Sequence, residues 1–121
     1  MIAKSDDPRL AVLIDADNVP SQIATRLFEE IDKIGQTAVR RIYGDFSGTQ
    51  LKAWAEIIPA HAVKAHQNFA STSHKNASDI ALVIDAMDLL YTGRFEGFCL
   101  VSSDSDFTGL AMRLREEGLT V

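Results

Sequence analysis

The stretch that decides the fold is residues 10–20, LAVLIDADNVP. Its first five residues are all apolar, and such a short run is typical of a strand that is buried on both faces of a parallel sheet. Pro20 stands where a helix would begin, so Asp15, Asp17 and Asn18 fall in a strand-to-helix turn. Turns of this kind lie at the carboxyl edge of an open α/β sheet, where ligands bind. Two carboxylates and an amide at this edge predict a functional site.

The size and charge of the chain limit the kinds of protein it can be. It has 121 residues, enough for one domain, and a net charge of −5 that excludes a globally basic nucleic-acid binder. We expect a loose arm over residues 1–9, which is not a signal peptide, and one domain over residues 10–121. No apolar run is long enough to cross a membrane. The single cysteine, Cys99, is expected to be a buried strand residue rather than a nucleophile, and a cytoplasmic protein is the default expectation.

Hydrophobic periodicity and helix breakers divide the chain into alternating strands and helices. Strands are expected at residues 10–14, 37–43, 62–65 and 97–101, and residues 119–121 resemble the opening of a fifth strand. Helices are expected at residues 20–34, about 48–58, 77–91 and about 108–117, with ends at Gly35, Pro59, Gly93 and Gly118. This alternation predicts an α/β fold with three layers, in which helices cover both faces of a parallel sheet of order 3-2-1-4-5.

Apolar spacing also predicts which side of each helix is buried. For the first helix the expected buried residues are Ile23, Leu27, Ile31 and Ile34, and for the third helix they are Ile80, Val83, Ile84, Met87 and Tyr91. Leu82 and Leu89 would then project from the opposite side of the third helix, either as a small homodimer contact or as a second buried face. Asp85 and Asp88 are expected to be solvated.

The predicted topology brings acidic residues from distant parts of the chain to one crevice. Strands one and four are neighbours in this strand order, and Asp15 and Asp17 follow strand one, while Asp104 and Asp106 follow strand four. Asp79 lies in the first turn of the third helix, which begins at the same edge. Five crowded carboxylates take up protons or bind cations, and all-oxygen ligands favour Mg²⁺ or Mn²⁺. A divalent ion held in this way can support phosphodiester hydrolysis.

Each acidic residue also has a purely structural interpretation. Asp17 or Asn18 could cap the first helix, because Asp and Asn are favoured at that position. Asp79 follows Asn76 by three residues, close to a capping-box pattern, and Asp104 or Asp106 could cap the fourth helix. One cap needs only one acidic residue, however, and each strand end here has two.

Three segments together resemble the NYN domain family, the LabA-like branch of the PIN-like ribonuclease superfamily. They are residues 13–19, LIDADNV, residues 75–80, KNASDI, and residues 101–107, VSSDSDF, and the resemblance extends from residue 10 to residue 121. It implies a metal-dependent ribonuclease with catalytic and metal-binding acids at Asp15, Asp79, Asp104 and Asp106. Asn18 matches the family's amide, and Asp17 is a weaker match. Similar bacterial proteins often carry a further RNA-binding region of the OST-HTH type, and the resemblance implies a possible region of this type C-terminal to residue 121 in the full-length protein.

One segment has the character of a substrate-binding surface. Residues 57–78 contain no acidic residue but include Lys64, Lys75 and three histidines. The two lysines could hold phosphates and Phe69 could stack on a base, and with Ser103 they form the expected RNA-binding set. His74 is a candidate general base. A solvated loop with no binding role explains the same composition equally well.

Two other functions fit part of the pattern. The Asp15-Ala16-Asp17 spacing also matches the start of haloacid-dehalogenase phosphatases, in which the first Asp is a covalent nucleophile and the second a general acid. The spacing of Asp104 and Asp106 is shorter than in the later acidic motif of those enzymes. A non-catalytic RNA-binding or scaffolding module on the same fold is the other alternative, and the presence of all the acids argues against it.

Overall fold

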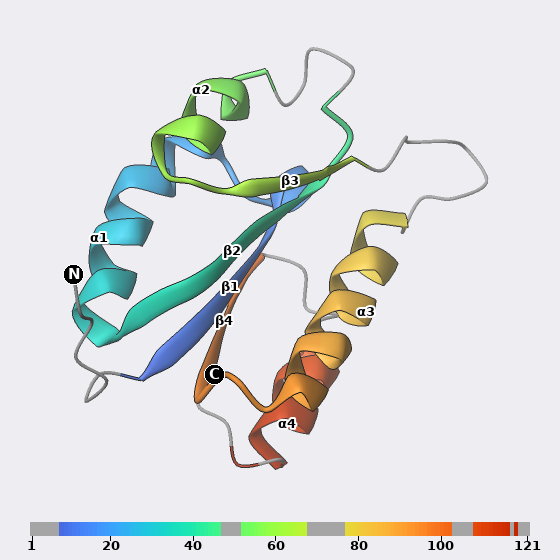
Figure 1. The fold of residues 1–121 in the computed structure, drawn as a ribbon. Coiled ribbons are helices and arrows are strands. Elements are labelled where there is room, and N and C mark those ends of the chain that lie inside the picture. Colours follow the sequence, from blue (N-terminus) through green and yellow to red (C-terminus); the bar gives the residue numbers. More distant parts are fainter. Residues whose placement is uncertain (1–7, 47–51, 68–76, 103–107, 117, 119–121) are drawn as a thin grey trace.

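A parallel four-stranded sheet forms the centre of the molecule, as Figure 1 shows. The computed structural model describes residues 8–46, 52–67, 77–102, 108–116 and 118. The strands are β1 (Arg9–Asp15), β2 (Gln36–Gly44), β3 (Lys64–Gln67) and β4 (Gly97–Val101), in the order β3-β2-β1-β4. The predicted parallel α/β fold and the order of its first four strands are therefore confirmed. The expected fifth strand lies outside the described residues.

Helices cover both faces of this sheet (Figure 1). On one face lie α1 (Ala24–Ile34) and α2 (Trp54–Ala60), and on the other lie α3 (Ala77–Thr92) and α4 (Thr108–Glu116). Two short 3₁₀ turns, η1 (Ala16–Asn18) and η2 (Ser21–Ile23), connect β1 to α1. No helix in the described part of the chain is both long and apolar enough to span a bilayer.

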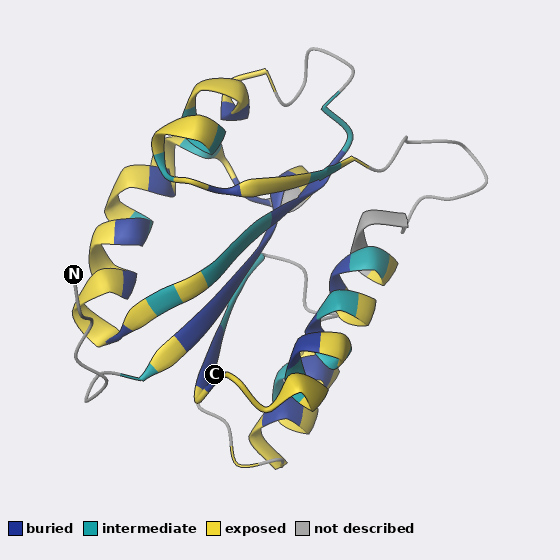
Figure 2. Cartoon of the chain, viewed as in Figure 1, coloured by how far each residue is buried: buried dark blue, intermediate teal, exposed yellow. Residues whose placement is uncertain are grey.

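The apolar run of β1 supplies both hydrophobic cores, as the dark blue of this strand in Figure 2 shows. Because side chains alternate along a strand, Leu10, Val12 and Ile14 pack with α1 and α2, while Ala11 and Leu13 pack with α3 and α4. All five are at most 2% exposed. An uninterrupted apolar run, rather than an alternating pattern, is what a strand in this position requires.

The first two helices differ in detail from the sequence prediction. Phe28 and Ile31 are buried in α1, whereas Ile23 lies before the helix and Ile34 at its end, both exposed, so the expected apolar face is partly wrong. Pro59 was expected to end the second helix but lies inside α2. The turn continues past this proline because the backbone N–H of His61 donates to the Ile57 carbonyl.

The buried face of α3 is opposite to the one predicted. Leu82, Ala86 and Leu89 pack against the sheet with exposures of 1%, 0% and 4%. The predicted face is instead exposed over most of its length: Ile80 58%, Val83 36%, Ile84 55% and Tyr91 72%. Of the two interpretations of Leu82 and Leu89, the second buried face is therefore correct and the homodimer contact is wrong. Because α3 is apolar on nearly all sides, spacing alone does not select its inner face.

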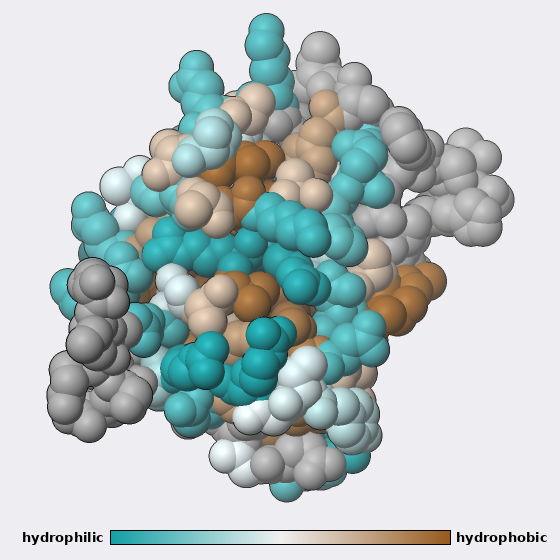
Figure 3. Space-filling view, in the orientation of Figure 1, coloured by the Kyte–Doolittle hydropathy of each residue, from teal (hydrophilic) through white to brown (hydrophobic). Residues whose placement is uncertain are grey.

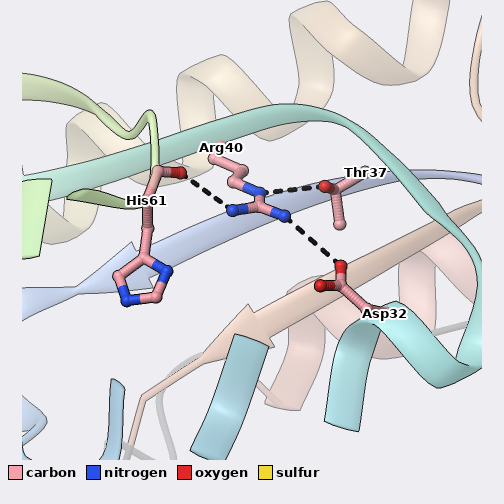
Figure 4. Close-up of polar contacts among 4 residues, drawn as sticks. All are labelled: Asp32, Thr37, Arg40 and His61. Atoms are coloured by element: carbon pink, nitrogen blue, oxygen red, sulfur yellow. Dashed lines mark hydrogen bonds and ion pairs between the residues drawn. The ribbon is translucent and has the colours of Figure 1, made fainter. Parts of the chain in front are cut away.

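Arg40 of β2 joins three elements on the α1 and α2 side of the sheet, as Figure 4 shows. Its guanidinium donates to the Thr37 hydroxyl at 2.8 Å, to the His61 carbonyl at 2.8 Å and to the Asp32 carboxylate at 3.3 Å. It also lies 4.7 Å from the centre of the Phe28 ring. These contacts connect α1, β2 and the turn after α2, and the planar fork of arginine suits such multiple bonding.

Gly35 allows the start of β1 to approach the turn between α1 and β2. A Cβ atom at this position would lie 2.5 Å from the Pro8 carbonyl oxygen, which accepts a hydrogen bond from the Gln36 amide at 2.8 Å. The predicted helix end at Gly35 is confirmed. The requirement for glycine here comes from this close backbone approach.

Candidate active site

Asp15 is the centre of the candidate site. It ends β1, follows Leu13 on the α3 and α4 side of the sheet, and is 1% exposed. Its Oδ2 accepts a hydrogen bond of 2.8 Å from the hydroxyl of Ser102, the residue that follows β4. Because Ile14 pairs with Val101, the two polar residues stand side by side at the ends of the two neighbouring strands. A buried carboxylate is costly unless it is bonded or holds a cation, so this position favours a binding role.

The other predicted site residues differ in how far the structure describes them. Asp17 is exposed in η1, and Asn18 ends the same turn. The N-cap position of α1 is occupied by Ile23, which makes no side-chain capping bond. Asp79 lies in the first turn of α3, three residues before Leu82. Outside the described residues lie Ser103, Asp104, Asp106, Phe69, His74 and Lys75.

The donors at the end of β1 and β4 have the chemistry that hard divalent cations prefer. Asp15 offers a carboxylate and Ser102 a hydroxyl, and the sequence continues from Ser102 to Asp104 and Asp106. Oxygen donors of this kind fit Mg²⁺ or Mn²⁺ rather than zinc. Within the described residues, His, Cys, Asp and Glu side chains do not gather in threes at metal-binding distance. A complete ligand set would therefore need the acidic residues that follow β4 or begin α3.

The strand register extends the site across the sheet. Asp15 stands opposite Tyr43 of β2, and Tyr43 stands opposite His66 of β3. Lys64 is exposed at the start of β3, opposite Arg41, and so lies two residues before this row. His66, from the acid-free segment, therefore shares a row with Asp15. Its ring packs edge-on against Tyr43, with 5.2 Å between the ring centres.

Asp85 of α3 belongs to a polar network next to this row, which corrects the expectation that it is solvated. Its Oδ2 accepts hydrogen bonds from the Tyr43 hydroxyl at 2.6 Å and from Arg41 at 3.1 Å, and lies 3.8 Å from Nδ1 of His66. Only 16% of the Asp85 side chain is exposed. The error follows from the phase of α3, since turning the helix brings Asp85 toward β2. Asp88 is exposed, as expected.

Burial and the hydrogen bond to Asp85 raise the pKa of the Tyr43 hydroxyl well above its usual range. The hydroxyl therefore remains a donor throughout the physiological pH range. Its hydrogen bond to Asp85 links the middle of α3 to β2. The network combines residues that are far apart in sequence, and position 85 differs from the exposed Asp88 only in the direction that its side chain takes from α3, which spacing did not predict.

The Tyr43→Phe variant is expected to lower the free energy of unfolding by about 1–3 kcal/mol, because a buried, charge-assisted hydrogen bond is lost. Since the pKa of Tyr43 is raised on folding, this contribution is fully present below the ordinary tyrosine pKa of about 10 and is lost as the pH rises above it. Urea unfolding measures both effects. Tyr91→Phe is the matched control, because Tyr91 is 72% exposed, and an equal loss in both variants would contradict the network.

Cys99 is a strand residue, as predicted, but it is half-buried rather than fully buried. It belongs to β4 and stands opposite Val12 of β1. Burial raises the pKa of its thiol, so the reactive thiolate is disfavoured.

Comparisons with known proteins identify the family and the fold. The model of the NYN domain matches residues 9–121, nearly the whole chain. Among solved structures, a protein of unknown function from Vibrio parahaemolyticus RIMD 2210633 is similar in fold, with a TM-score of 0.69 and 17% sequence identity. The aligned region covers 94% of this chain and 78% of that chain. No curated protein matches significantly. At this identity the structural likeness shows the fold alone.

Proposed function

Because the chain belongs to the NYN domain family, a part of the PIN-like nuclease superfamily, we propose that it is a metal-dependent ribonuclease. The observation that carries the proposal is the buried carboxylate of Asp15 at the end of β1, bonded to Ser102 at the end of β4. This is the edge of an open α/β sheet at which ligands bind. NYN domains are typically nucleases, and PIN-like nucleases generally use divalent metals.

The proposed ligands of Mg²⁺ or Mn²⁺ are Asp15 and Asp104, which follow neighbouring strands. Asp79 and Asp106 would complete or orient the water shell, and Asn18 would hold a water or phosphate by hydrogen bonding. Asp17, exposed in η1, has at most a secondary role. A bound divalent ion lowers the pKa of its water and neutralises charge on the reacting phosphate.

Ser102 positions Asp15 in this scheme. Its hydroxyl donates to Oδ2, which fixes the rotamer of the carboxylate at the end of β1. Asp15 is only 1% exposed, and a low-dielectric site strengthens the charge interactions inside it. Ser102 belongs to the segment VSSDSDF, residues 101–107, but the sequence pattern did not predict that it would bond to Asp15.

The RNA strand is proposed to cross the ends of β1 and β2 toward β3. His66 shares the row of Asp15 and Tyr43, and Lys64 is exposed two residues earlier on β3. Lys75, Phe69 and Ser103 are the remaining proposed contacts. Because the chain has a net charge of −5, binding of RNA phosphates requires such a local set of cationic side chains.

Millimolar Mn²⁺ is expected to raise the melting temperature of the wild-type protein by several degrees, because a ligand that binds only the folded state stabilises it by mass action. Asp15→Asn should show a much smaller shift, since it lacks a charge that the metal needs. Differential scanning fluorimetry with Mn²⁺, Mg²⁺ and excess chelator makes the measurement. Equal shifts in both proteins would place metal binding elsewhere.

Cleavage of a panel of single-stranded and structured RNAs, with and without Mn²⁺, tests the activity itself. Metal-dependent cleavage supports the ribonuclease. Trapping of an aspartyl adduct by beryllofluoride at Asp15 would support a haloacid-dehalogenase-like phosphatase instead. Binding of RNA by the folded protein without cleavage would support a non-catalytic module.

A further inference from the structure

One oxygen of Asp85 holds nitrogen-bearing side chains from two neighbouring strands. Its Oδ2 accepts a hydrogen bond of 3.1 Å from Nη1 of Arg41 on β2 and lies 3.8 Å from Nδ1 of His66 on β3. The same oxygen accepts the bond of 2.6 Å from the hydroxyl of Tyr43, which is itself buried. Because only 16% of the Asp85 side chain is exposed, this carboxylate is a fixed anchor for both nitrogen-bearing side chains.

This anchor uses only a small part of the hydrogen-bonding capacity of Arg41 and His66. A guanidinium has five N–H donors, and among the described residues that of Arg41 bonds to Asp85 alone. Nε2 of His66 makes no hydrogen bond to the described part of the chain. The side chains of Arg41 and His66 are 24% and 37% exposed. Both can therefore bind a further group from solvent while they remain beside Asp85.

The charge around these two residues is positive, although the chain as a whole is acidic. Lys64 is exposed on β3 and stands opposite Arg41, so the two side chains leave the sheet on the same face. We call Arg41, Lys64 and His66 the β2–β3 strip. Its lysine and arginine outweigh the one negative charge of Asp85, and residues 57–78 add no acidic residue. Figure 3 shows hydrophilic surface through the centre of the view, over β2 and β3. Such a surface favours an anion.

The β2–β3 strip continues the row of residues that begins at Asp15. Asp15 stands opposite Tyr43 and Tyr43 opposite His66, so His66 lies two strand spacings from Asp15, about 10 Å. Arg41 precedes Tyr43 by two residues and shares its face of the sheet. The strip also reaches the edge of the sheet, because β3 is the edge strand. A surface of this length suits a chain that carries several phosphates better than one small anion.

We propose that Arg41 and His66 bind the phosphate backbone of the RNA strand that enters the candidate site, and that Lys64 continues this contact at the edge of the sheet. The inference rests on the proposed ribonuclease function, because it takes RNA as the ligand. Arg41 binds a phosphate through the N–H groups that Asp85 does not use. His66 donates from Nε2, while Nδ1 stays beside Asp85 and keeps the ring in place. Contacts of this kind position the RNA without reading its bases.

The salt dependence of RNA binding tests Arg41. Fluorescence anisotropy with a labelled single-stranded RNA, in excess chelator to prevent metal-dependent cleavage, gives the affinity at a series of salt concentrations. Loss of one phosphate contact should reduce the slope of log Kobs against log salt by about 0.7 in Arg41→Gln. Arg41→Lys keeps the charge and should keep the slope. If Arg41 had only a structural role, both variants would lose stability and neither would change the slope.

Two further variants keep this test independent of the bond to Asp85. Lys64→Gln should reduce the slope by the same amount, and Lys64 is exposed, so the fold should not change. Arg26→Gln is the matched control, because Arg26 is an exposed arginine of α1, in the other helical layer. It removes the same charge from the chain and should leave the slope as in the wild type.

His66→Phe tests the histidine, since it keeps an aromatic ring against Tyr43 but removes both ring nitrogens. RNA affinity should fall by the same factor for oligonucleotides of different sequence, because a backbone contact is lost. Tyr43→Phe is the control for the network: it removes a bond to the same oxygen of Asp85 but no proposed RNA contact. It should bind RNA like the wild type, at temperatures where thermal melting shows that all variants are folded.

The outcomes separate this inference from the ribonuclease proposal. RNA binding with a wild-type slope in Arg41→Gln and Lys64→Gln, and with wild-type affinity in His66→Phe, would overturn the inference and leave the ribonuclease standing. An equal change of slope in Arg26→Gln would also overturn it, because the effect would then follow net charge alone. Binding that depends on the β2–β3 strip, in a protein that cuts no RNA, would support the strip and contradict the ribonuclease. A wild type that binds no RNA would overturn both.

Discussion

RNA cleavage by the Asp15→Asn variant is expected to fall by more than about 100-fold, because even residues that only orient metal ligands typically contribute 10–100-fold. Asparagine keeps the size of aspartate and can still accept a hydrogen bond from Ser102, so the end of β1 should keep its structure. What it loses is the negative charge proposed to hold the metal. A single-turnover cleavage assay with saturating Mn²⁺ measures the effect, and circular dichroism checks the fold.

Asp88→Asn is the matched control for this experiment. Asp88 is an exposed carboxylate on α3, so its replacement removes one charge without touching the end of β1. Asp85→Asn cannot serve, because Asp85 bonds to Tyr43 and Arg41 and its loss would disturb α3. Undiminished cleavage by a folded Asp15→Asn protein would contradict the ribonuclease mechanism as proposed.

Leu82→Ala is expected to lower the free energy of unfolding by about 2–5 kcal/mol, the usual cost of truncating a fully buried leucine. Leu82 is 1% exposed and packs with Leu13 of β1 in the core between α3 and the sheet. Chemical denaturation makes the measurement. The effect should be accompanied by earlier loss of helical signal, because Leu82 is one of the buried residues, with Ala86 and Leu89, that attach α3 to the sheet.

Ile84→Ala provides the comparison on the same helix. Ile84 is 55% exposed, and surface substitutions of this kind change stability by about 0.5 kcal/mol or less. If Ile84→Ala cost as much as Leu82→Ala, the inner and outer faces of α3 would have to be exchanged. The pair of variants thus decides which apolar stripe forms the core.

The central part of the fold could be predicted because β1 carries an unambiguous signal. Five consecutive apolar residues can be satisfied only where both faces of a strand are covered, and this requirement led to the parallel sheet and its helical layers. The position of Asp15 at the carboxyl edge followed from the same run. Parallel topology then brought the ends of β1 and β4 together, as the bond between Asp15 and Ser102 confirms.

The face of α3 could not be predicted because the helix lacks a polar side of its own. Ile80 and Ile84 are as apolar as Leu82 and Leu89, so two heptad stripes compete and packing decides between them. The small side chain of Ala86 lets the helix backbone approach the sheet, a preference that hydrophobicity alone does not express. The error about Asp85 followed directly, because its role depends on which way the helix is turned.

Because side chains of β1 alternate between the two hydrophobic cores, the position of Asp15 depends on the exact number of residues in this strand. Odd-numbered positions from Ala11 to Asp15 face α3, and even-numbered ones face α1 and α2. Insertion or deletion of one residue in this strand would turn every later side chain to the opposite face. The carboxylate of Asp15 would then point away from Tyr43, and both hydrophobic cores would receive the wrong side chains. Natural variation in this strand should therefore consist of substitutions, with changes of length confined to the loops.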